Sequence, residues 1–102
     1  MYQFTTPTIR ITIPETLPVS SMTALVITML QGKVKLEKKL SDVQLDTENN
    51  VIIFTLTQEE TGMFSPNNIV GVQCHILVGD TAYATDLMGA TIGRNIHGEV
   101  IV

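Results

Sequence analysis

Four side chains of this 102-residue chain have the chemistry for nucleophilic catalysis: Cys74, His75, Asp86 and His97. A nucleophile needs a base within hydrogen-bond reach and a third group that orients the base. Cys74 and His75 are neighbours in a segment with the alternation of a β-strand, so their side chains should point to opposite faces. We therefore expect Cys74 to be a small core residue, His75 to face outward, and the chain not to be an enzyme.

Metal, cofactor and nucleotide sites each have a characteristic spacing of residues, and none of these spacings occurs here. There is no paired-cysteine, H-E-x-x-H or calcium-loop pattern, and the seven glycines are scattered singly,. Glu59 and Glu60 are adjacent, but Glu60 has a structural use as a helix-capping residue, which leaves Glu59 in solvent. We predict no cofactor and no bound metal.

β-Strands are the elements that must position these side chains, because Val, Ile and Thr are frequent and apolar residues alternate with polar ones,. Gly32 and the pair Gly79 and Asp80 predict tight turns, and Gly89 predicts a bulge or a bend. Thr57 followed three residues later by Glu60 predicts one helical turn over residues 58–63. The expected strands cover residues 8–13, 23–31, 33–38, 43–45, 51–56, 69–78 and 81–92.

This pattern predicts an all-β fold in one domain, residues 1–102, because the chain has the length of a single domain and contains no linker. About seven short strands separated by turns are typical of a β-sandwich, and a small β-barrel is the alternative with the same strand pattern. The inward faces of the strands predict a core that includes Ile11, Ile27, Phe54, Leu56, Val72, Cys74 and Ile76.

Composition narrows the class of partner. Only 16% of the residues are charged, the net charge is −4 and the mean hydropathy is +0.27. An acidic chain is repelled by phosphate backbones, so we expect no nucleic-acid partner. No apolar run has the length of a membrane span, and the first residues do not resemble a secretion leader, so we expect synthesis in the cytoplasm. Such a sparsely charged surface favours association with another protein.

The segment at residues 33–39 contains four lysines: Lys33, Lys35, Lys38 and Lys39. These lysines could form a patch that binds anions. Their near-alternating spacing fits better with a solvated strand face that prevents pairing with other strand edges. We therefore expect this strand to stay unpaired at its outer edge.

Three segments carry a resemblance to a known family. They are T-P-T-I-R-I-T-I-P at residues 6–14, F-T-L-T-Q-E-E-T at residues 54–61 with Phe64 following, and residues 72–94, which contain V-Q, G-D, T-D and G-R. Together they resemble small tail-associated proteins of phages and prophages of Gram-positive bacteria. They are similar to the N-terminal immunoglobulin-like domain of baseplate upper proteins.

The resemblance implies an immunoglobulin-like β-sandwich that is a structural part of a phage tail or baseplate in the virion, made in a bacterial host. Its partners would be other tail proteins and a second copy of itself. The alternatives are a monomeric adaptor or regulator that binds a host protein and, third, a carbohydrate-binding module. Strand addition or face-to-face packing would form the contacts, and the candidate interface residues are Ile9, Ile11, Ile13, Glu99, Val100, Ile101 and Val102.

Overall fold

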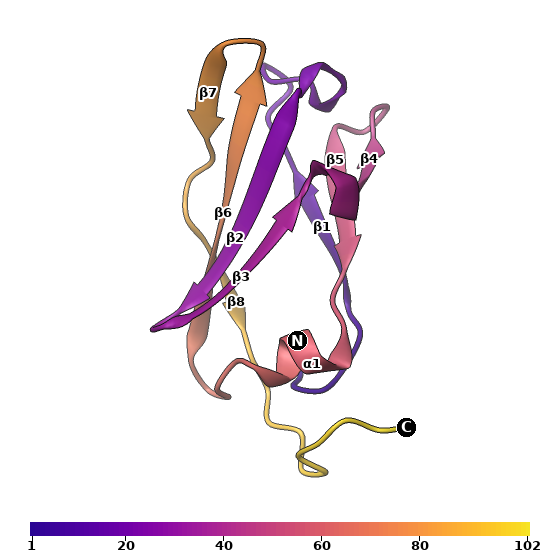
Figure 1. Cartoon of the computed structure of the whole chain (residues 1–102), viewed down its shortest axis with the longest axis vertical. Helices are drawn as coiled ribbons and strands as arrows, with labels where there is room; N and C mark the ends of the chain where they lie inside the picture. The colour runs from indigo at the N-terminus through magenta and orange to yellow at the C-terminus, as the bar shows by residue number, and fades with distance from the viewer.

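The computed structural model describes all 102 residues, and its two antiparallel β-sheets pack face to face (Figure 1). The smaller sheet has the order β1 (Thr8–Thr12), β5 (Val51–Thr55), β4 (Gln44–Asp46). The larger sheet has the order β3 (Val34–Lys39), β2 (Ala24–Gln31), β6 (Ile69–Val78), and both β7 (Thr81–Ala84) and β8 (Met88–Thr91) pair with β6. Single helical turns, η1 (Val19–Ser21), η2 (Leu40–Asp42) and α1 (Gln58–Gly62), connect the strands. The prediction of an all-β sandwich is confirmed.

The order of the strands is immunoglobulin-like. Strands β1, β5 and β4 occupy the positions B, E and D of an immunoglobulin domain, and the larger sheet occupies the positions C′, C, F and G,. β7 and β8 share the G position, so the eight strand segments fill seven positions. Each sheet keeps two free edge strands, so the structure is not a closed barrel,.

Alternation along the strands places the core between the two sheets. All seven residues predicted for the core are buried: Ile11, Ile27, Phe54, Leu56, Val72, Cys74 and Ile76. In β6 the inward residues from Val70 to Ile76 are buried, Val78 at the end of the same face is half-buried, and the residues on the other face are exposed or half-buried. Because a strand has a period of two, this single register fixes which side chains face solvent.

A β-bulge divides the last strand. Ala84 pairs with His75 and Met88 pairs with Val72, so three residues on one side face two on the other,. Thr85 fills the gap, because its hydroxyl accepts a hydrogen bond from the Cys74 N–H at 3.0 Å and its own N–H donates to the Cys74 carbonyl at 3.0 Å. The predicted bulge or bend of this strand therefore occurs at residues 85–87 and not at Gly89, because the Thr85 hydroxyl supplies the partner that the Cys74 N–H would otherwise lack.

The helical turn α1 forms where the sequence predicted it. The Glu60 N–H donates to the Thr57 hydroxyl at 3.1 Å, and the Thr57 N–H donates to Glu60 Oε1 at 2.8 Å. These two bonds are a capping box, which satisfies two backbone donors that the first turn would leave free,. A five-residue helix is marginal by itself, so the capping box determines that it forms here.

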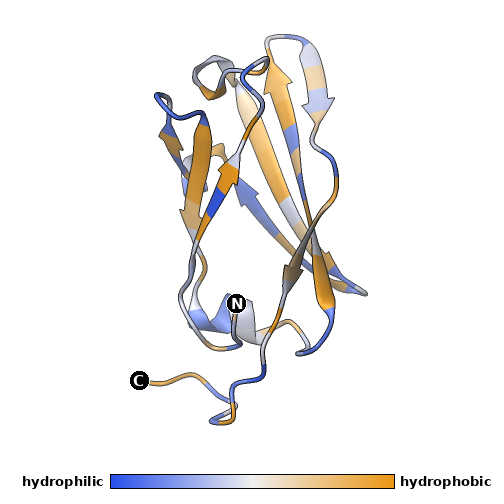
Figure 2. Ribbon diagram, turned by 180° about the vertical axis from the view of Figure 1, so that it is seen from behind, coloured by the Kyte–Doolittle hydropathy of each residue, from blue (hydrophilic) through white to orange (hydrophobic).

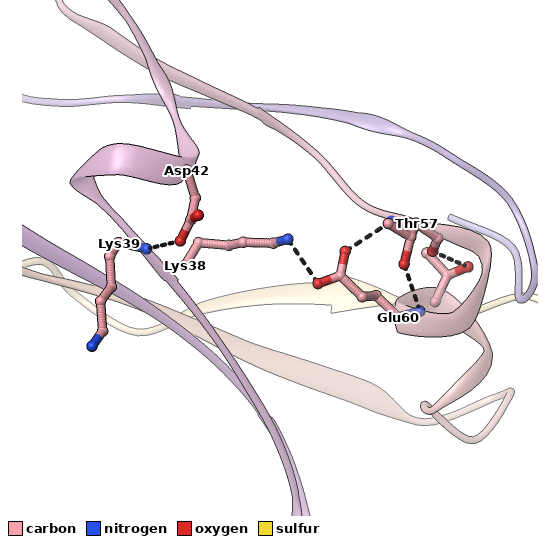
Figure 3. Close-up of polar contacts among 6 residues, drawn as sticks. Lys38, Lys39, Asp42, Thr57 and Glu60 are labelled. Atoms are coloured by element: carbon pink, nitrogen blue, oxygen red, sulfur yellow. Dashed lines mark hydrogen bonds and ion pairs between the residues drawn. The ribbon is translucent and has the colours of Figure 1, made fainter.

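The second oxygen of the Glu60 carboxylate joins α1 to the larger sheet. Lys38 Nζ lies 2.7 Å from Glu60 Oε2, and only 15% and 18% of the two side chains are exposed. Figure 3 shows the Lys38 side chain pointing toward Glu60, whereas that of Lys39 extends away from it. The interpretation of all four lysines as solvated was therefore wrong for Lys38, because β3 turns this side chain toward the loop that carries α1.

Glu60→Gln should lower the free energy of unfolding at pH 7 by roughly 1–2 kcal/mol, because glutamine keeps the capping box but loses the charge that pairs with Lys38. Burial raises the pKa of Glu60, but the hydrogen bonds from Lys38 and Thr57 outweigh it and hold the pKa below its ordinary value of 4.5,. A lowered pKa stabilises the fold above the unfolded-state value, and this contribution is lost as the pH falls through the folded-state value. Urea unfolding at pH 7 and pH 3 should therefore show the difference between the variants shrinking at pH 3. A difference that is independent of pH would contradict this.

Candidate functional site

The structure keeps the four nucleophile candidates apart. The Cys74 side chain is buried in the core, and His75 is exposed on the opposite face of β6. Asp86 lies in the bulge at the sheet edge, and His97 is exposed in the segment after β8. The prediction that Cys74 and His75 point to opposite faces is confirmed.

Cys74 should resist thiol reagents in the folded protein. Burial raises the pKa of its thiol to about 11, while a hydrogen bond with Thr85 acts in the other direction and is weaker. A protonated, buried thiol is a poor nucleophile. We expect a maleimide or disulfide reagent to label Cys74 only as fast as the protein opens, and to label it at once in denaturant. Rapid labelling of the native protein would show a reactive cysteine.

No group of three or more His, Cys, Asp or Glu side chains is placed so that it could hold a metal ion. None of the helical turns has the length or the hydrophobicity needed to cross a membrane.

The interface residues predicted on β1 lie in two environments. Ile11 and Ile13 are buried in the core, so the prediction that their side chains form an interface was wrong. Pro7 and Pro14, which have no N–H to donate to a neighbouring strand, flank this segment, and β1 is an edge strand,. However, the apolar face of β1 points inward and forms part of the core between the two sheets. Ile9 is half-buried against the core, so only the outer backbone edge of β1 is free.

The predicted C-terminal interface, Glu99, Val100, Ile101 and Val102, follows a course along the end of the sandwich (Figure 1). Ile101 and Val102 are exposed and Val100 is half-buried. The Gln58 side chain holds this segment, because its Nε2 donates to the Ile101 carbonyl at 3.0 Å and its Oε1 accepts from the Ile101 N–H at 2.8 Å. One amide group therefore binds the tail as a neighbouring strand would.

The most unusual surface is the outer face of the larger sheet, which we define by the outward residues of β2, β6, β7 and β8 with Leu87. Antiparallel sheets with one solvated face normally carry polar residues on that face. Here eight of the outward residues are apolar, and polar side chains are few. The apolar residues are Ala24, Val26, Leu30, Ile69, Leu77, Ala82, Ala84 and Leu87, and the polar residues are Thr28, Gln73, His75 and Thr91.

Hydropathy along the strands follows the same pattern. In Figure 2 the long strand β6 is coloured mainly hydrophobic, with two hydrophilic bands. Near His75 the outer face has a shallow hollow of about 250 Å³, and Ala24, Val26, Leu77 and Ala82 are among its lining residues. The hollow contains no pair of groups that could act as acid and base, so its chemistry is that of apolar contact.

Two glycines of the outer face, Gly71 and Gly89, each lie beneath an apolar side chain. A Cβ atom on Gly71 would lie 3.3 Å from Leu87 Cδ1, and one on Gly89 would lie 3.1 Å from Ile69 Cγ2. Leu87 and Ile69 therefore lie over the glycine backbone. The extra residue of the bulge shifts the alternation by one, which places Leu87 outward and Met88 inward against the core,.

The two lateral edges of the outer face carry opposite charge. On β3, Lys35, Glu37 and Lys39 point outward, because they pair with the outward residues of β2. At the other edge, Asp80 lies in the turn before β7 and Asp86 in the bulge after it, with no basic residue between them. The centre of the outer face is therefore apolar, and its edges are basic on one side and acidic on the other.

Sequence reasoning missed this surface, although one signal was present. The run from Ala24 to Leu30 is apolar at almost every position, and a strand with two apolar faces must bury both or expose one,. This composition predicts a strand that is covered on both faces or central in its sheet. β2 is indeed central, between β3 and β6, but no layer covers its outer face. The alanines of β7 gave no signal, because alanine is common on any surface.

A groove lies on the side where β1 and β7 leave their edges free. Its volume is about 480 Å³, and it is lined by Ile11, Pro14, Leu17, Tyr83 and Met88 among others. Asp86 is its only charged residue. The groove is an apolar recess between the two sheets without catalytic groups.

Comparison with known proteins adds no identification. No protein-family model matches the chain, and no curated protein matches it by sequence.

Proposed function

We propose that this chain is a structural component of a phage or prophage tail or baseplate that acts by binding other proteins through the outer face. The observation that carries the proposal is an exposed, mainly apolar sheet face on a chain that has no assembled catalytic group. Large exposed apolar patches on folded domains are typical of protein-protein interfaces. The assignment to a phage tail comes from the resemblance of residues 6–14, 54–61 and 72–94 to baseplate proteins.

A β-sandwich with one apolar outer face suits an assembly role. Packing two sheets face to face buries side chains without any change of backbone, so the interface is available in the folded monomer. Removing apolar area from water stabilises such a contact by roughly 25 cal/mol per Å² before the costs of association are subtracted. Fixed strands hold Val26 and Leu77, so little ordering is required on binding.

Co-migration with particles tests the proposal. An antibody against this protein should detect it in the tail or particle fraction of a density gradient after induction of a lysogen that carries its gene. A Val26→Glu variant expressed in place of the wild type should be lost from that fraction, because it buries a charge in the interface. Thr12→Glu, an exposed position on β1, is the control and should stay in it. Wild-type protein found only in the free soluble fraction would refute the tail assignment.

A further inference from the structure

We propose that the free edge of β1 and the groove beside it bind an extended segment of a partner protein as an added β-strand. The segment would carry apolar side chains at alternate positions and a lysine or arginine near Asp86. The site lies between the two sheets and not on the outer face, so it is a second binding site beyond that of the proposed function. The two surfaces can therefore be tested separately.

Every second residue of β1 directs its backbone groups away from the sheet. The Ile13 N–H donates to the Asn50 carbonyl at 3.0 Å, so Ile13 forms a hydrogen-bonded pair with the residue before β5. Residues of an antiparallel strand bond alternately to one side and to the other. The N–H and C=O groups of Thr8, Arg10 and Thr12 therefore point away from β5, toward an edge on which β1 has no neighbouring strand. These unpaired groups are the ones that an added strand would bind.

The other free edges are protected against strand addition, whereas that of β1 is not. β3 carries lysines and β4 has only three residues. β7 and β8 have four residues each and are separated by the bulge. Short strands, lysines and bulges are the usual means by which edge strands avoid pairing. β1 has five residues, of which only Arg10 is charged, so its edge is the one most open to an added strand.

No segment of the chain itself covers this edge. The N-terminal residues pair elsewhere, because the Gln3 N–H donates to the Gly93 carbonyl at 3.0 Å and the Gly93 N–H donates to the Met1 carbonyl at 2.7 Å. The C-terminal segment lies at the end of the sandwich, where the Gln58 side chain binds both backbone groups of Ile101. Because both segments are bound elsewhere, a strand on the edge of β1 must come from another molecule.

The groove determines which side chains the added strand should carry. A strand beside β1 places alternate side chains on the same face as Ile11, and this face lines the groove,. Pro14, Leu17 and Met88 make the groove apolar, so these side chains should be apolar. Asp86, the only charged residue of the groove, is exposed and takes part in no ion pair. A lysine or arginine at the end of the added strand would complement its charge.

Charge favours a different protein over a second copy of this chain. The exposed apolar segment of a second copy, residues 99–102, carries Glu99 but no lysine or arginine. A second copy of β1 would carry Arg10 on the face opposite to Ile11, which is the face away from the groove,. Neither segment supplies a basic group beside Asp86, so we assign the edge to a strand of a different protein.

Synthetic peptides test the site. The probe is a peptide of alternating valine and threonine with a lysine at each end, and the matched peptide has a glutamate at each end. Hydrogen exchange measured by NMR should be fast at the Arg10 and Thr12 amides of the free protein and slow once the lysine peptide is bound. We expect the lysine peptide to bind about threefold more tightly than the glutamate peptide, because an exposed ion pair with Asp86 contributes modestly.

Arg10→Pro removes the outward N–H without removing a bond to β5, and proline is tolerated at such an edge position. Measured against Arg10→Ala, which lacks the same side chain but keeps the N–H, it should weaken peptide binding at least about tenfold. Asp86→Lys should reverse the preference between the two peptides, whereas Glu48→Lys, the same change of charge in the turn before β5, should not. Thermal unfolding checks that the variants fold, and Thr12→Pro against Thr12→Ala repeats the comparison if Arg10→Pro does not.

No protection of the Arg10 and Thr12 amides at about 1 mM peptide, or equal binding by Arg10→Pro and Arg10→Ala, would show that this edge does not accept a strand. Equal affinity of the wild type for the two peptides would overturn the assignment of a basic partner. Protection of both amides in the concentrated protein without peptide would assign the edge to a second copy instead. None of these results bears on the outer face, so the particle test of the proposed function stays valid and the two failures are distinguishable.

Discussion

Phe64→Ala is expected to lower the free energy of unfolding by about 3–5 kcal/mol. Phe64 follows α1 and is among the largest fully buried side chains, with 1% of its surface exposed. Its surroundings cannot close on the cavity easily, because two side chains hold the peptide group between Phe64 and Ser65 in place. Gln3 Nε2 donates to the Phe64 carbonyl at 2.9 Å, and the Ser65 N–H donates to Gln31 Oε1 at 2.6 Å. Urea unfolding monitored by circular dichroism measures the loss.

Phe64→Leu is the matched variant, because it keeps an apolar side chain of intermediate volume. We expect it to lose about half as much stability as Phe64→Ala. A loss below about 1 kcal/mol for Phe64→Ala would show that the end of the sandwich repacks freely, which the hydrogen bonds of Gln3 and Gln31 do not allow.

Asn50→Ala should have the second large effect, about 2–4 kcal/mol. Asn50 Oδ1 accepts from the Val19 N–H at 2.8 Å, and Asn50 Nδ2 donates to the Ile13 carbonyl at 2.8 Å. The side chain therefore holds the loop between β1 and η1 against the smaller sheet. Alanine would leave the buried Val19 N–H without a partner, and the φ of 57° at this position disfavours any residue with a Cβ except asparagine and aspartate,.

Two further variants separate the effect of the lost hydrogen bonds from the effect of the positive φ. Asn50→Gly removes the side chain but accepts the positive φ, so it should be less destabilising than alanine by about 1 kcal/mol. Asn50→Asp keeps the acceptor for Val19 and loses the donor, so it should lie between the wild type and alanine. Equal stability of the alanine and glycine variants would show that the backbone conformation is not under strain.

Residues with a local signal could be predicted from the sequence. The strand alternation gave the seven buried residues, the pair Thr57 and Glu60 gave the capping box, and Gly79 gave the turn before β7. Gly79 has φ of 59°, and Asp80 is not in the left-handed region, which is the φ pattern of a type II′ turn,. These features depend on residues a few positions apart, so the pattern alone determines them.

Features that depend on distant residues could not be predicted. Asparagine is a residue type that tolerates the left-handed conformation, but no local pattern shows that the Asn50 side chain reaches residues more than 30 positions away,. The bulge depends on Thr85 meeting Cys74, and the pairing of Lys38 with Glu60 joins two elements that no spacing relates. The outer face is also a product of topology, because it forms only when β2, β6 and β7 become neighbours.

Hydroxyl-radical footprinting tests most directly whether the outer face is the assembly surface. The reactivities of Leu87, which is 73% exposed, and of His75 would be compared between the free protein at low concentration and the same protein in purified tail particles. Met63, which is 44% exposed on the turn that ends α1, is the internal control away from the outer face. We expect Leu87 and His75 to be protected in the particle while Met63 keeps its reactivity. Unchanged reactivity of Leu87 and His75 in the particle would contradict assembly through this surface.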